Sequence, residues 1–483
     1  MSTLNIIDSD IYKSEILFVS NYSDTLTRTE HNIASRLNDK IAYKILTYRK
    51  SSLPNTVSYE EFLEDNIYDI KKLDILEFSK KYKNINLYLP MITERLMVDY
   101  NNMFSVLGKR YYSLDDINFF IVSYLMFLEE YIKNTNLIFN GYSDNFISTL
   151  THYLSQDYDV RAISFTDYGV LNTSTFYLTD SLYGQPYKDF IPSKGKIIKS
   201  ELDAGDAKES LKEYAEKIEN VGNPIFGVFS YNIFNFKYII FAFNGYKTKN
   251  KEIYKFLNID RPSIINKLFA NIVRVFYRIS SLIYFKLVND KFDKKYKYIY
   301  YPLQMQPEAS TSARTPFLMN QLSVIENISK SLPLGYKLLV KEHPLAIGLR
   351  FFWYYKQIDL LPNVQIVSNN YSGRDLIKFS ELVIGGGGTS TFEAIYLGKK
   401  HILLGNFCYM QSSMLRYVDN IKNLHNEIVS FLDFEIKNKE DEKKRMIEYF
   451  SQRALPLYED FHENVANGLT AIYNLELNKK GLH

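Results

Sequence analysis

The pattern of apolar and polar positions predicts that strands and helices alternate along the first part of the chain. Short apolar runs, each followed by turn residues, predict strands at 16–19, 41–48, 85–89, 137–139 and 160–165. Stretches with helical periodicity separate several of them, and Ser113 to Asp116 form a capping signal for a helix that extends to about residue 133. This alternation is typical of βαβ units that build a parallel sheet.

Residues 200–295 break the alternation. The sequence there predicts a charged surface helix at 204–219, an aromatic strand-like segment at 225–243 and a long helix at 266–291. The long helix is apolar except for a narrow polar stripe formed by Lys267, Asn271, Arg274 and Arg278. Such a helix either packs under its own domain or touches an anionic lipid surface.

The alternation resumes in the second half, where apolar runs predict strands at 298–303, 337–340, 364–367, 382–384 and 401–404. Helices are predicted at 316–331, at 375–379 and from about residue 391, and the chain past residue 430 is helical. We therefore predict two α/β domains, at 1–200 and 296–430, joined by a mainly helical linker or insertion at 201–295 and followed by a helical tail at 431–483.

Composition excludes several classes of protein. The 483 residues carry 58 Lys and Arg against 55 Asp and Glu, a net charge of +3 that argues against a dedicated nucleic-acid binder and an acidic disordered chain. A single cysteine, Cys408, argues against disulfides and a cysteine-based zinc site. The 41 Tyr and 33 Phe mostly follow the strand and helix patterns, which indicates core positions. We expect no transmembrane helix and no signal peptide, and therefore a soluble cytoplasmic protein.

Polar residues follow two strands of the second half. Ligands bind outside the carboxyl ends of strands in open parallel sheets, so these positions are candidates for binding. A loop with Gln306 and Glu308 follows the strand at 298–303, and Lys341, His343 and Pro344 follow the strand at 337–340. A lysine and an imidazole at a strand end are able to donate hydrogen bonds to a phosphate.

A third strand end carries four glycines followed by hydroxyl residues. Gly387 and Gly388 belong to this run, which leads into Thr389, Ser390 and Thr391 at the start of a helix. Glycines let backbone N–H groups approach an anion, and the helix dipole favours its charge. No GK[ST] follows, so the sequence predicts neither ATP hydrolysis nor NAD binding. Glu393 either completes a capping box with Ser390 or accepts a hydrogen bond from a ribose hydroxyl.

The first half offers candidates for the chemistry itself. Asn140 and Gly141 end one predicted strand and are expected on the acceptor side, and Asp167 follows another. A carboxylate at a strand end can take a proton from an acceptor hydroxyl or attack a sugar carbon. Asp180 is a second carboxylate nearby in the sequence, where a turn or cap role is the alternative.

These residues resemble those of capsule-polysaccharide biosynthesis glycosyltransferases, which include the Kdo transferases of capsule export systems and are related to bacterial sialyltransferases that use CMP-activated sugars. The resemblance covers about residues 296–405. It rests on the segments 301–308, 341–344 and 388–400, and on the order Asp167-x-Gly169, His343-Pro344, Ser390-Thr391.

The resemblance implies a GT-B-like fold, in which two Rossmann-like domains turn their parallel sheets toward a central cleft and the second domain binds the nucleotide sugar. It implies transfer of an ulosonic acid, Kdo or a nonulosonic acid, from a CMP-activated donor to a bacterial surface glycan, without a metal or cofactor. His343, Ser390 and Thr391 would hold the CMP phosphate. The partners would be the nucleotide sugar and an oligosaccharide or glycolipid acceptor, but no nucleic acid. Peripheral contact with the inner face of the cytoplasmic membrane belongs to the lipid-binding alternative for the helix at 266–291.

One position departs from the family. Relatives carry an acidic residue directly before the glycine, where this chain has Tyr168, so either Asp167 serves through a one-residue shift or Asp180 takes the role. Three hypotheses stay open at this point: a CMP-sugar transferase, a UDP-sugar or CDP-glycerol-type transferase of the same fold, and a non-catalytic subunit of capsule assembly.

Overall fold

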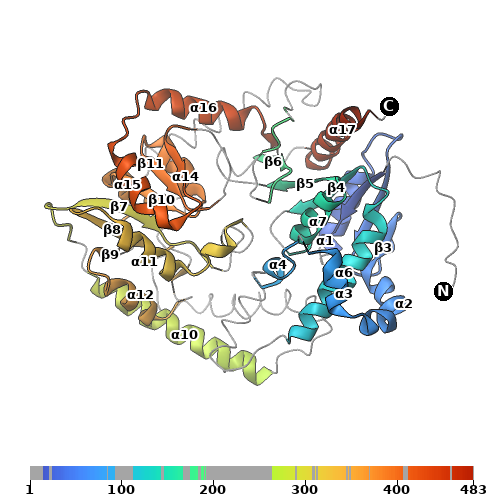
Figure 1. Ribbon diagram of the computed structural model, residues 1–483, viewed down its shortest axis with the longest axis horizontal. Helices are drawn as coiled ribbons and strands as arrows, with labels where there is room; N and C mark the ends of the chain where they lie inside the picture. Colours follow the sequence, from blue (N-terminus) through green and yellow to red (C-terminus); the bar gives the residue numbers. More distant parts are fainter. Residues whose placement is uncertain are drawn as a thin grey trace.

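The computed structural model describes two α/β domains (Figure 1). The described residues are 15–20, 24–83, 85–92, 113–142, 146–166, 175–182, 186–189, 191, 264–288, 291–306, 311, 314–343, 346–347, 350–368, 370–405, 412–456 and 460–481. The predicted elements at 204–219 and 225–243 lie outside these residues.

The first domain is built on a seven-stranded sheet with the order β13-β6-β5-β4-β1-β2-β3. Its strands are β1 (Glu15–Val19), β2 (Ala42–Thr47), β3 (Thr56–Ser58), β4 (Leu137–Tyr142), β5 (Arg161–Thr166), β6 (Thr175–Thr179) and β13 (Leu455–Pro456). The five strands from β5 to β3 are parallel, whereas β6 runs antiparallel to β5 and β13 antiparallel to β6. Strand order reverses between β1 and β4, which makes this the switch point of the sheet.

Helices cover both faces of this sheet. Side chains alternate between the faces of β1, so Leu17 packs on one side and Phe18 on the other. The Leu17 side is covered by α2 (Tyr59–Lys72), α3 (Ile75–Lys81), α6 (Leu114–Ile132) and α7 (Phe146–Asp157). The Phe18 side is covered by α1 (Asp24–Ala34) and α17 (Phe461–Lys480). Many of the chain's tyrosines and phenylalanines lie in these cores, as in the edge-on contact of Phe18 with Phe139.

The second domain is built on a six-stranded, fully parallel sheet with the order β12-β11-β10-β7-β8-β9. Its strands are β7 (Lys297–Pro302), β8 (Tyr336–Lys341), β9 (Val364–Val367), β10 (Leu382–Gly385), β11 (Lys400–Leu403) and β12 (Leu415–Tyr417). One face packs against α10 (Ile264–Leu287), α11 (Gln321–Ser331), α12 (Phe352–Asp359) and α15 (Leu424–Asp433), and the other against α13 (Gly373–Phe379) and α14 (Thr389–Tyr396).

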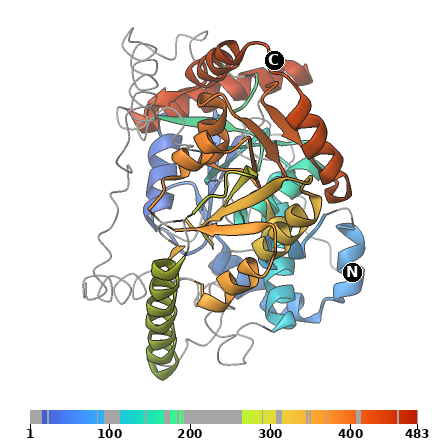
Figure 2. The ribbon, with the colours of Figure 1, turned by 90° about the vertical axis from the view of Figure 1, so that its left-hand side faces the viewer.

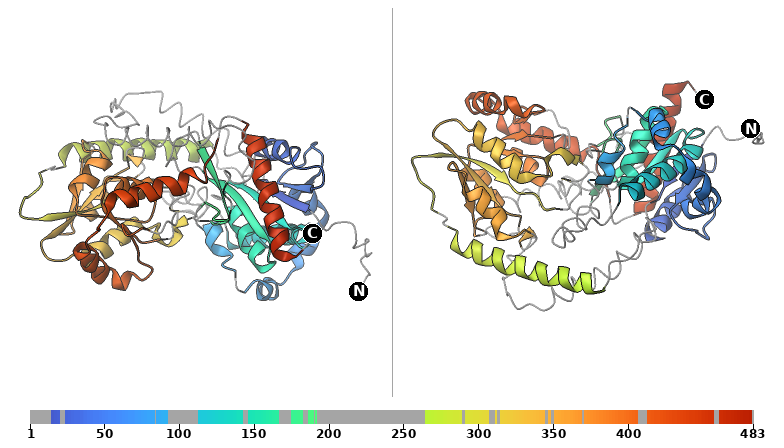
Figure 3. Two further views of the ribbon diagram at one scale, coloured as in Figure 1. Left: turned by 90° about the horizontal axis from the view of Figure 1, so that it is seen from above. Right: turned by 60° about the horizontal axis from the view of Figure 1, so that its bottom comes forward.

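The end of the chain returns to the first domain. Helix α16 (Lys439–Ser451) lies against α14 of the second domain, and β13 and α17 then join the sheet of the first domain (Figures 1 and 3). Contacts between Tyr177 on β6 and Phe450 on α16 continue this connection. The predicted helical tail is therefore divided between both domains.

Two predicted elements differ from the structure. The predicted strand at 85–89 is wrong, because Tyr88 begins a short helix, α4 (Tyr88–Ile92). The predicted helix at 316–331 is divided into a 3₁₀ turn, η3 (Pro316–Leu318), and α11, which Asn320 caps through Ser323 N. The capping box predicted at Ser113 is confirmed, with Asp116 as its partner. Among the described residues, no helix is both long and apolar enough to cross a membrane.

Helix α17 contributes core residues to the first domain, although the strands of the second domain lie before it in the sequence. Leu469 is fully buried in the cluster behind β1 and β4. We therefore predict that Leu469→Ala lowers the free energy of unfolding by roughly 2–5 kcal/mol, measured by urea unfolding. Leu334→Ala, at a fully exposed position of the second domain, is the control and leaves stability nearly unchanged. Equal effects of both substitutions would contradict this packing.

Candidate functional site

The structure brings the three polar strand ends of the second half together. Strands β10, β7 and β8 are neighbours in the sheet, and the strand order reverses between β10 and β7. Their carboxyl ends therefore lie side by side at the switch point, where ligands bind in doubly wound sheets. The polar loop after β7, the segment from Lys341 to His343 and the glycine run all start from this edge.

Two glycines in the loop after β10 have backbone angles that other residues rarely adopt. Gly387 and Gly388 have φ angles of 129° and 127°, a region that side chains other than glycine rarely adopt. A Cβ on Gly388 would lie only 3.3 Å from Gln304 Oε1, in the loop after β7. The loop thus lies directly against the neighbouring strand end, and its backbone leads into the amino end of α14.

Two hydroxyls at the start of α14 have no partner. Within the described part of the chain, neither Ser390 Oγ nor Thr391 Oγ1 forms a hydrogen bond, although both atoms are buried. The side chain of Thr391 is almost completely enclosed. A buried hydroxyl without a partner is costly, and a bound anion at a helix amino end would satisfy both groups. The pair is suited to hold a phosphate.

Of the two alternatives for Glu393, the capping box with Ser390 is wrong, and the ribose contact stays a prediction. Gly388 is the N-cap, so Ser390 already lies inside the helix, and no side chain caps this end. Glu393 Oε1 instead lies 3.5 Å from Arg374 Nε on α13. Burial raises the pKa of Glu393, and the Arg374 charge opposes this effect.

The end of β8 presents a buried cation. Lys341 is almost fully buried, and its Nζ donates to the carbonyl of Glu342 at 3.2 Å. Burial lowers the pKa of the Lys341 ammonium to about 8. The next residues turn sharply, since the backbone N–H of His343 donates to Glu342 Oε1 at 2.7 Å. His343 is therefore positioned by the carboxylate that precedes it.

An ion pair that the sequence did not reveal holds this edge together. The completely buried Glu342 carboxylate accepts from Arg350 Nη1 at 2.7 and 2.6 Å and from the Tyr355 hydroxyl at 2.8 Å. Arg350 Nη2 also donates to the Gln304 carbonyl at 2.7 Å and to Gln306 Oε1 at 3.3 Å. One guanidinium thus joins the loop after β7 to the loop after β8.

The switch point of the first sheet is also polar. Asn140 and Gly141 are part of β4 and lie next to the end of β1, where Ser20 hydrogen-bonds to Thr27 at 2.8 Å. Gly141 has a φ of 61°, and a Cβ there would lie 3.2 Å from Glu30 Oε1. Asn140 Nδ2 donates to the Ser148 carbonyl at 3.4 Å, whereas its Oδ1 has no partner among the described residues.

Glu30 is a buried acid that sequence reasoning missed. It lies on α1, where a lone glutamate in a polar stretch gives no sign of burial. Burial raises the pKa of its carboxyl to about 8, opposed by a hydrogen bond from Ser20. Its Oε2 has no hydrogen-bond partner within the described ranges.

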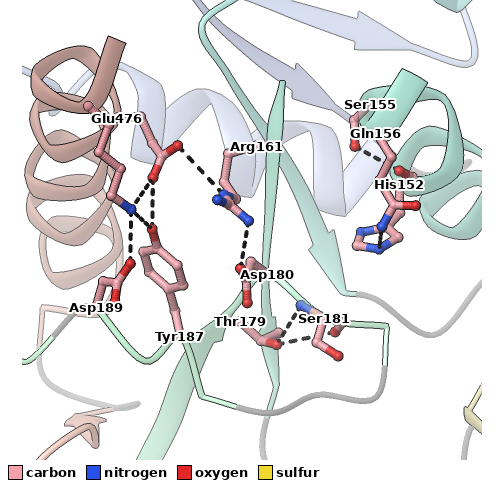
Figure 4. Close-up of polar contacts among 11 residues, drawn as sticks. His152, Ser155, Gln156, Arg161, Thr179, Asp180, Ser181, Tyr187, Asp189 and Glu476 are labelled. Atoms are coloured by element: carbon pink, nitrogen blue, oxygen red, sulfur yellow. Dashed lines mark hydrogen bonds and ion pairs between the residues drawn. The ribbon is translucent and has the colours of Figure 1, made fainter. Parts of the chain in front are cut away.

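Asp180 lies at the other edge of this sheet (Figure 4). Because β6 is antiparallel to β5, the chain beyond Thr179 runs toward the amino end of β5. There Asp180 pairs with Arg161 Nη1 at 3.0 Å, and Arg161 Nε lies 3.6 Å from Glu476 of α17. Asp180 thus belongs to a polar cluster that attaches α17, and it does not share an edge with Asn140 and Gly141.

The two domains meet at their carboxyl edges. Arg314, which follows the loop after β7, donates through Nη2 to Thr166 Oγ1 at 3.2 Å. Thr166 is the last residue of β5 and immediately precedes Asp167. Asp167, Glu308 and Pro344 lie outside the described residues, and their predicted roles stay predictions. No group of three or more acidic, histidine or cysteine side chains suited to a metal ion occurs among the residues that are described.

Comparison with known proteins defines no family. No protein-family model and no curated protein matches the chain. Similar solved structures include the UDP-GlcNAc 2-epimerase of Neisseria meningitidis bound to UDP-GlcNAc, at 11% identity and a TM-score of 0.25 over 96% of this chain and 99% of that one. They also include the KpsC β-Kdo 2,7-transferase of Thermosulfurimonas dismutans, at 11% identity and a TM-score of 0.32 over 71% and 88%. A glycosyltransferase of Rickettsia africae matches at 12% and 0.28 over 96% and 99%. At these scores the assignment to a GT-B-like α/β fold rests on the chain's own topology.

The Glu342–Arg350 pair yields a prediction about stability. Glu342→Gln removes the charge that faces a buried guanidinium, so we expect a loss of about 3–5 kcal/mol in the free energy of unfolding. Glu326→Gln is the matched control, since Glu326 faces Lys330 at 3.9 Å on the surface and should change little. Urea unfolding measures both. A loss no larger than that of the control would show that the pair does not hold this edge.

Glu30 yields a prediction about pH. An acid with a normal pKa near 4.5 when unfolded and about 8 when folded favours unfolding increasingly as pH rises between these values. Glu30→Gln has no titrating group at this position. The difference in free energy of unfolding between this variant and the natural protein should therefore shift in favour of the variant by roughly 1.4 kcal/mol per pH unit between about pH 5 and 8. Urea unfolding across this range measures the difference, and a difference independent of pH would contradict the burial of an acid.

Proposed function

We propose that this protein is a glycosyltransferase that moves an ulosonic acid, Kdo or a nonulosonic acid, from a CMP-activated donor to a bacterial surface glycan. The observation that carries the proposal is the convergence of three strand ends at the switch point of the second sheet. Together they present a glycine loop, two unpartnered hydroxyls and the Lys341–His343 segment. This set suits a nucleotide phosphate and offers little to an uncharged ligand.

The donor phosphate would lie at the amino end of α14. The backbone of Gly387 and Gly388 would approach it closely, and Ser390 and Thr391 would donate their free hydroxyl protons. His343 would donate from the end of β8, which lies on the other side of β7. Gln306 lies on the same edge, held by Arg350, and Glu393 would accept from the ribose.

The transfer would need little from the protein besides charge placement. The bond between the anomeric carbon and the phosphate oxygen breaks, and CMP leaves with the bonding electrons as a phosphate monoester. The acceptor hydroxyl oxygen forms the new bond to that carbon and passes its proton to a carboxylate base. Helix α14 and His343 would stabilise the charge that grows on the leaving phosphate.

The base would come from the first domain. Asp167 directly follows Thr166, which Arg314 of the second domain contacts. A residue in this position is close in sequence to the point where the two carboxyl edges meet. Asp180 does not take part in the proposal, because its carboxylate is paired with Arg161 at the opposite edge. Asn140 and Gly141 would line the acceptor side at the switch point of the first sheet.

A nucleotide screen tests the donor class. We predict that CMP stabilises the protein in thermal shift and saturation-transfer measurements more than UDP, GDP or CDP does. His343→Ala should weaken CMP binding about 10-fold to 100-fold, the range for losing one hydrogen bond to a charged group. The exposed His425→Ala is the matched control and should bind CMP normally.

The outcomes separate the competing functions. A preferential response to UDP, or to CDP with transfer of glycerol phosphate, would replace the CMP donor with another donor of the same fold. Donor hydrolysis that disappears in Asp167→Asn while CMP still binds would exclude a non-catalytic subunit. Equal CMP affinity of His343→Ala and His425→Ala would show that CMP does not bind at this edge of the sheet.

A further inference from the structure

One face of α10 carries a line of exposed apolar side chains. Ile272, Phe276 and Ile283 are 66%, 58% and 53% exposed, and Val275, Ile279 and Leu287 are exposed with them. Spacings of three and four residues place all six on one side of the helix. Figures 2 and 3 show α10 along the outside of the second domain. An apolar line of this length on a surface is uncommon unless it binds something.

The opposite face of α10 fixes the helix to the domain. Leu282, Tyr284 and Phe285 are buried. Tyr284 stacks on Tyr355 of α12, and Phe285 contacts the same ring edge-on. Ser281 Oγ donates to the carbonyl of Arg350 at 2.6 Å. The exposed line therefore belongs to a helix in a set orientation, attached to the residue that joins the strand ends of the candidate site.

The exposed surface extends from α10 onto α12. Phe276 stacks on Phe351 with ring centroids 5.5 Å apart, and two residues further Trp353 is 59% exposed. Trp353 is the single tryptophan of the chain. Tryptophan favours the boundary between lipid headgroups and acyl chains, because its ring is apolar and its N–H is polar.

The charge of α10 favours an anionic binding partner. Its 24 residues contain no aspartate or glutamate and four cations: Lys267, Arg274, Arg278 and Lys286. Lys286 is exposed beside the apolar line, so a second copy of this helix would bring like charges together there. An anionic bilayer instead offers opposite charge to the cations and acyl chains to the apolar line.

We propose that α10 docks this protein on an anionic membrane surface, with Ile272, Phe276, Ile279 and Ile283 in the headgroup and acyl boundary and Trp353 beside them. Docking would hold the second domain against the bilayer through a rigid helix. A transferase with a lipid-linked acceptor would gain access to its substrate in this way. The docking itself rests on this surface alone and is independent of the donor nucleotide.

Vesicle flotation with the full chain tests the proposal. The natural protein should float with phosphatidylcholine vesicles that contain 30% phosphatidylglycerol, and much less with pure phosphatidylcholine or at high salt. The triple variant Ile272→Ser, Phe276→Ser, Ile283→Ser should lower the partition coefficient by about 100-fold or more, because three large apolar side chains no longer enter the bilayer.

A matched triple variant controls for general loss of surface hydrophobicity. Tyr68→Ser, Leu76→Ser, Leu334→Ser changes three large residues elsewhere that are more exposed than those of α10, and this variant should float like the natural protein. Circular dichroism and an unchanged midpoint of urea unfolding would show that the α10 variant is folded, and neither measurement depends on the donor nucleotide. Failure of the natural protein to float, or equal flotation of both triple variants, would overturn the proposal. So would a dimer in sedimentation velocity that the α10 variant loses without any vesicle binding.

Discussion

The buried ion pair between Arg350 and Glu342 is the interaction on which the candidate site depends. A completely buried carboxylate is costly unless it is paired and hydrogen-bonded, and here both conditions are met by Arg350, Tyr355 and the His343 backbone. The same guanidinium binds the Gln304 carbonyl in the neighbouring loop. Because Arg350 donates hydrogen bonds to both loops, it fixes the ends of β7 and β8 relative to each other. His343 is thereby held at the same edge of the sheet as the glycine loop.

The parallel sheets decide where polar groups are able to gather. Strand order reverses once in each described sheet, between β1 and β4 and between β7 and β10. Each switch point carries buried polar atoms without partners, Asn140 Oδ1 and Glu30 Oε2 in the first domain and the Ser390 and Thr391 hydroxyls in the second. Buried polar atoms without a partner also occur elsewhere in the described sheets, as at both ring nitrogens of His401 on β11. Unpaired groups at both switch points, with Arg314 reaching Thr166 between the edges, suit a two-substrate reaction.

The sequence predicted most of the strands because parallel strands are buried on both faces and appear as continuous apolar runs. A short apolar run such as 85–89 fits a strand and a helix equally well by its pattern alone. In the structure, its last two residues belong to α4. Strand β13 has two residues, too few for any pattern, and it pairs with β6 only because α16 carries the chain back. The glycine loop and Lys341–His343 were visible because residue type alone indicates anion binding. Glu30 and Arg350 were not, since their burial comes from contacts that no local spacing encodes.

The central claim is that the edge assembled by Arg350 and Glu342 binds a CMP-activated sugar for transfer. Mass spectrometry of the products formed from a panel of CMP-sugars and capsule oligosaccharide acceptors tests this most directly. The account predicts an acceptor heavier by one ulosonic acid residue, together with free CMP, from one of these donors and not from UDP-sugars. An acceptor that gains a hexose from a UDP-sugar, with no product from any CMP-sugar, would contradict it.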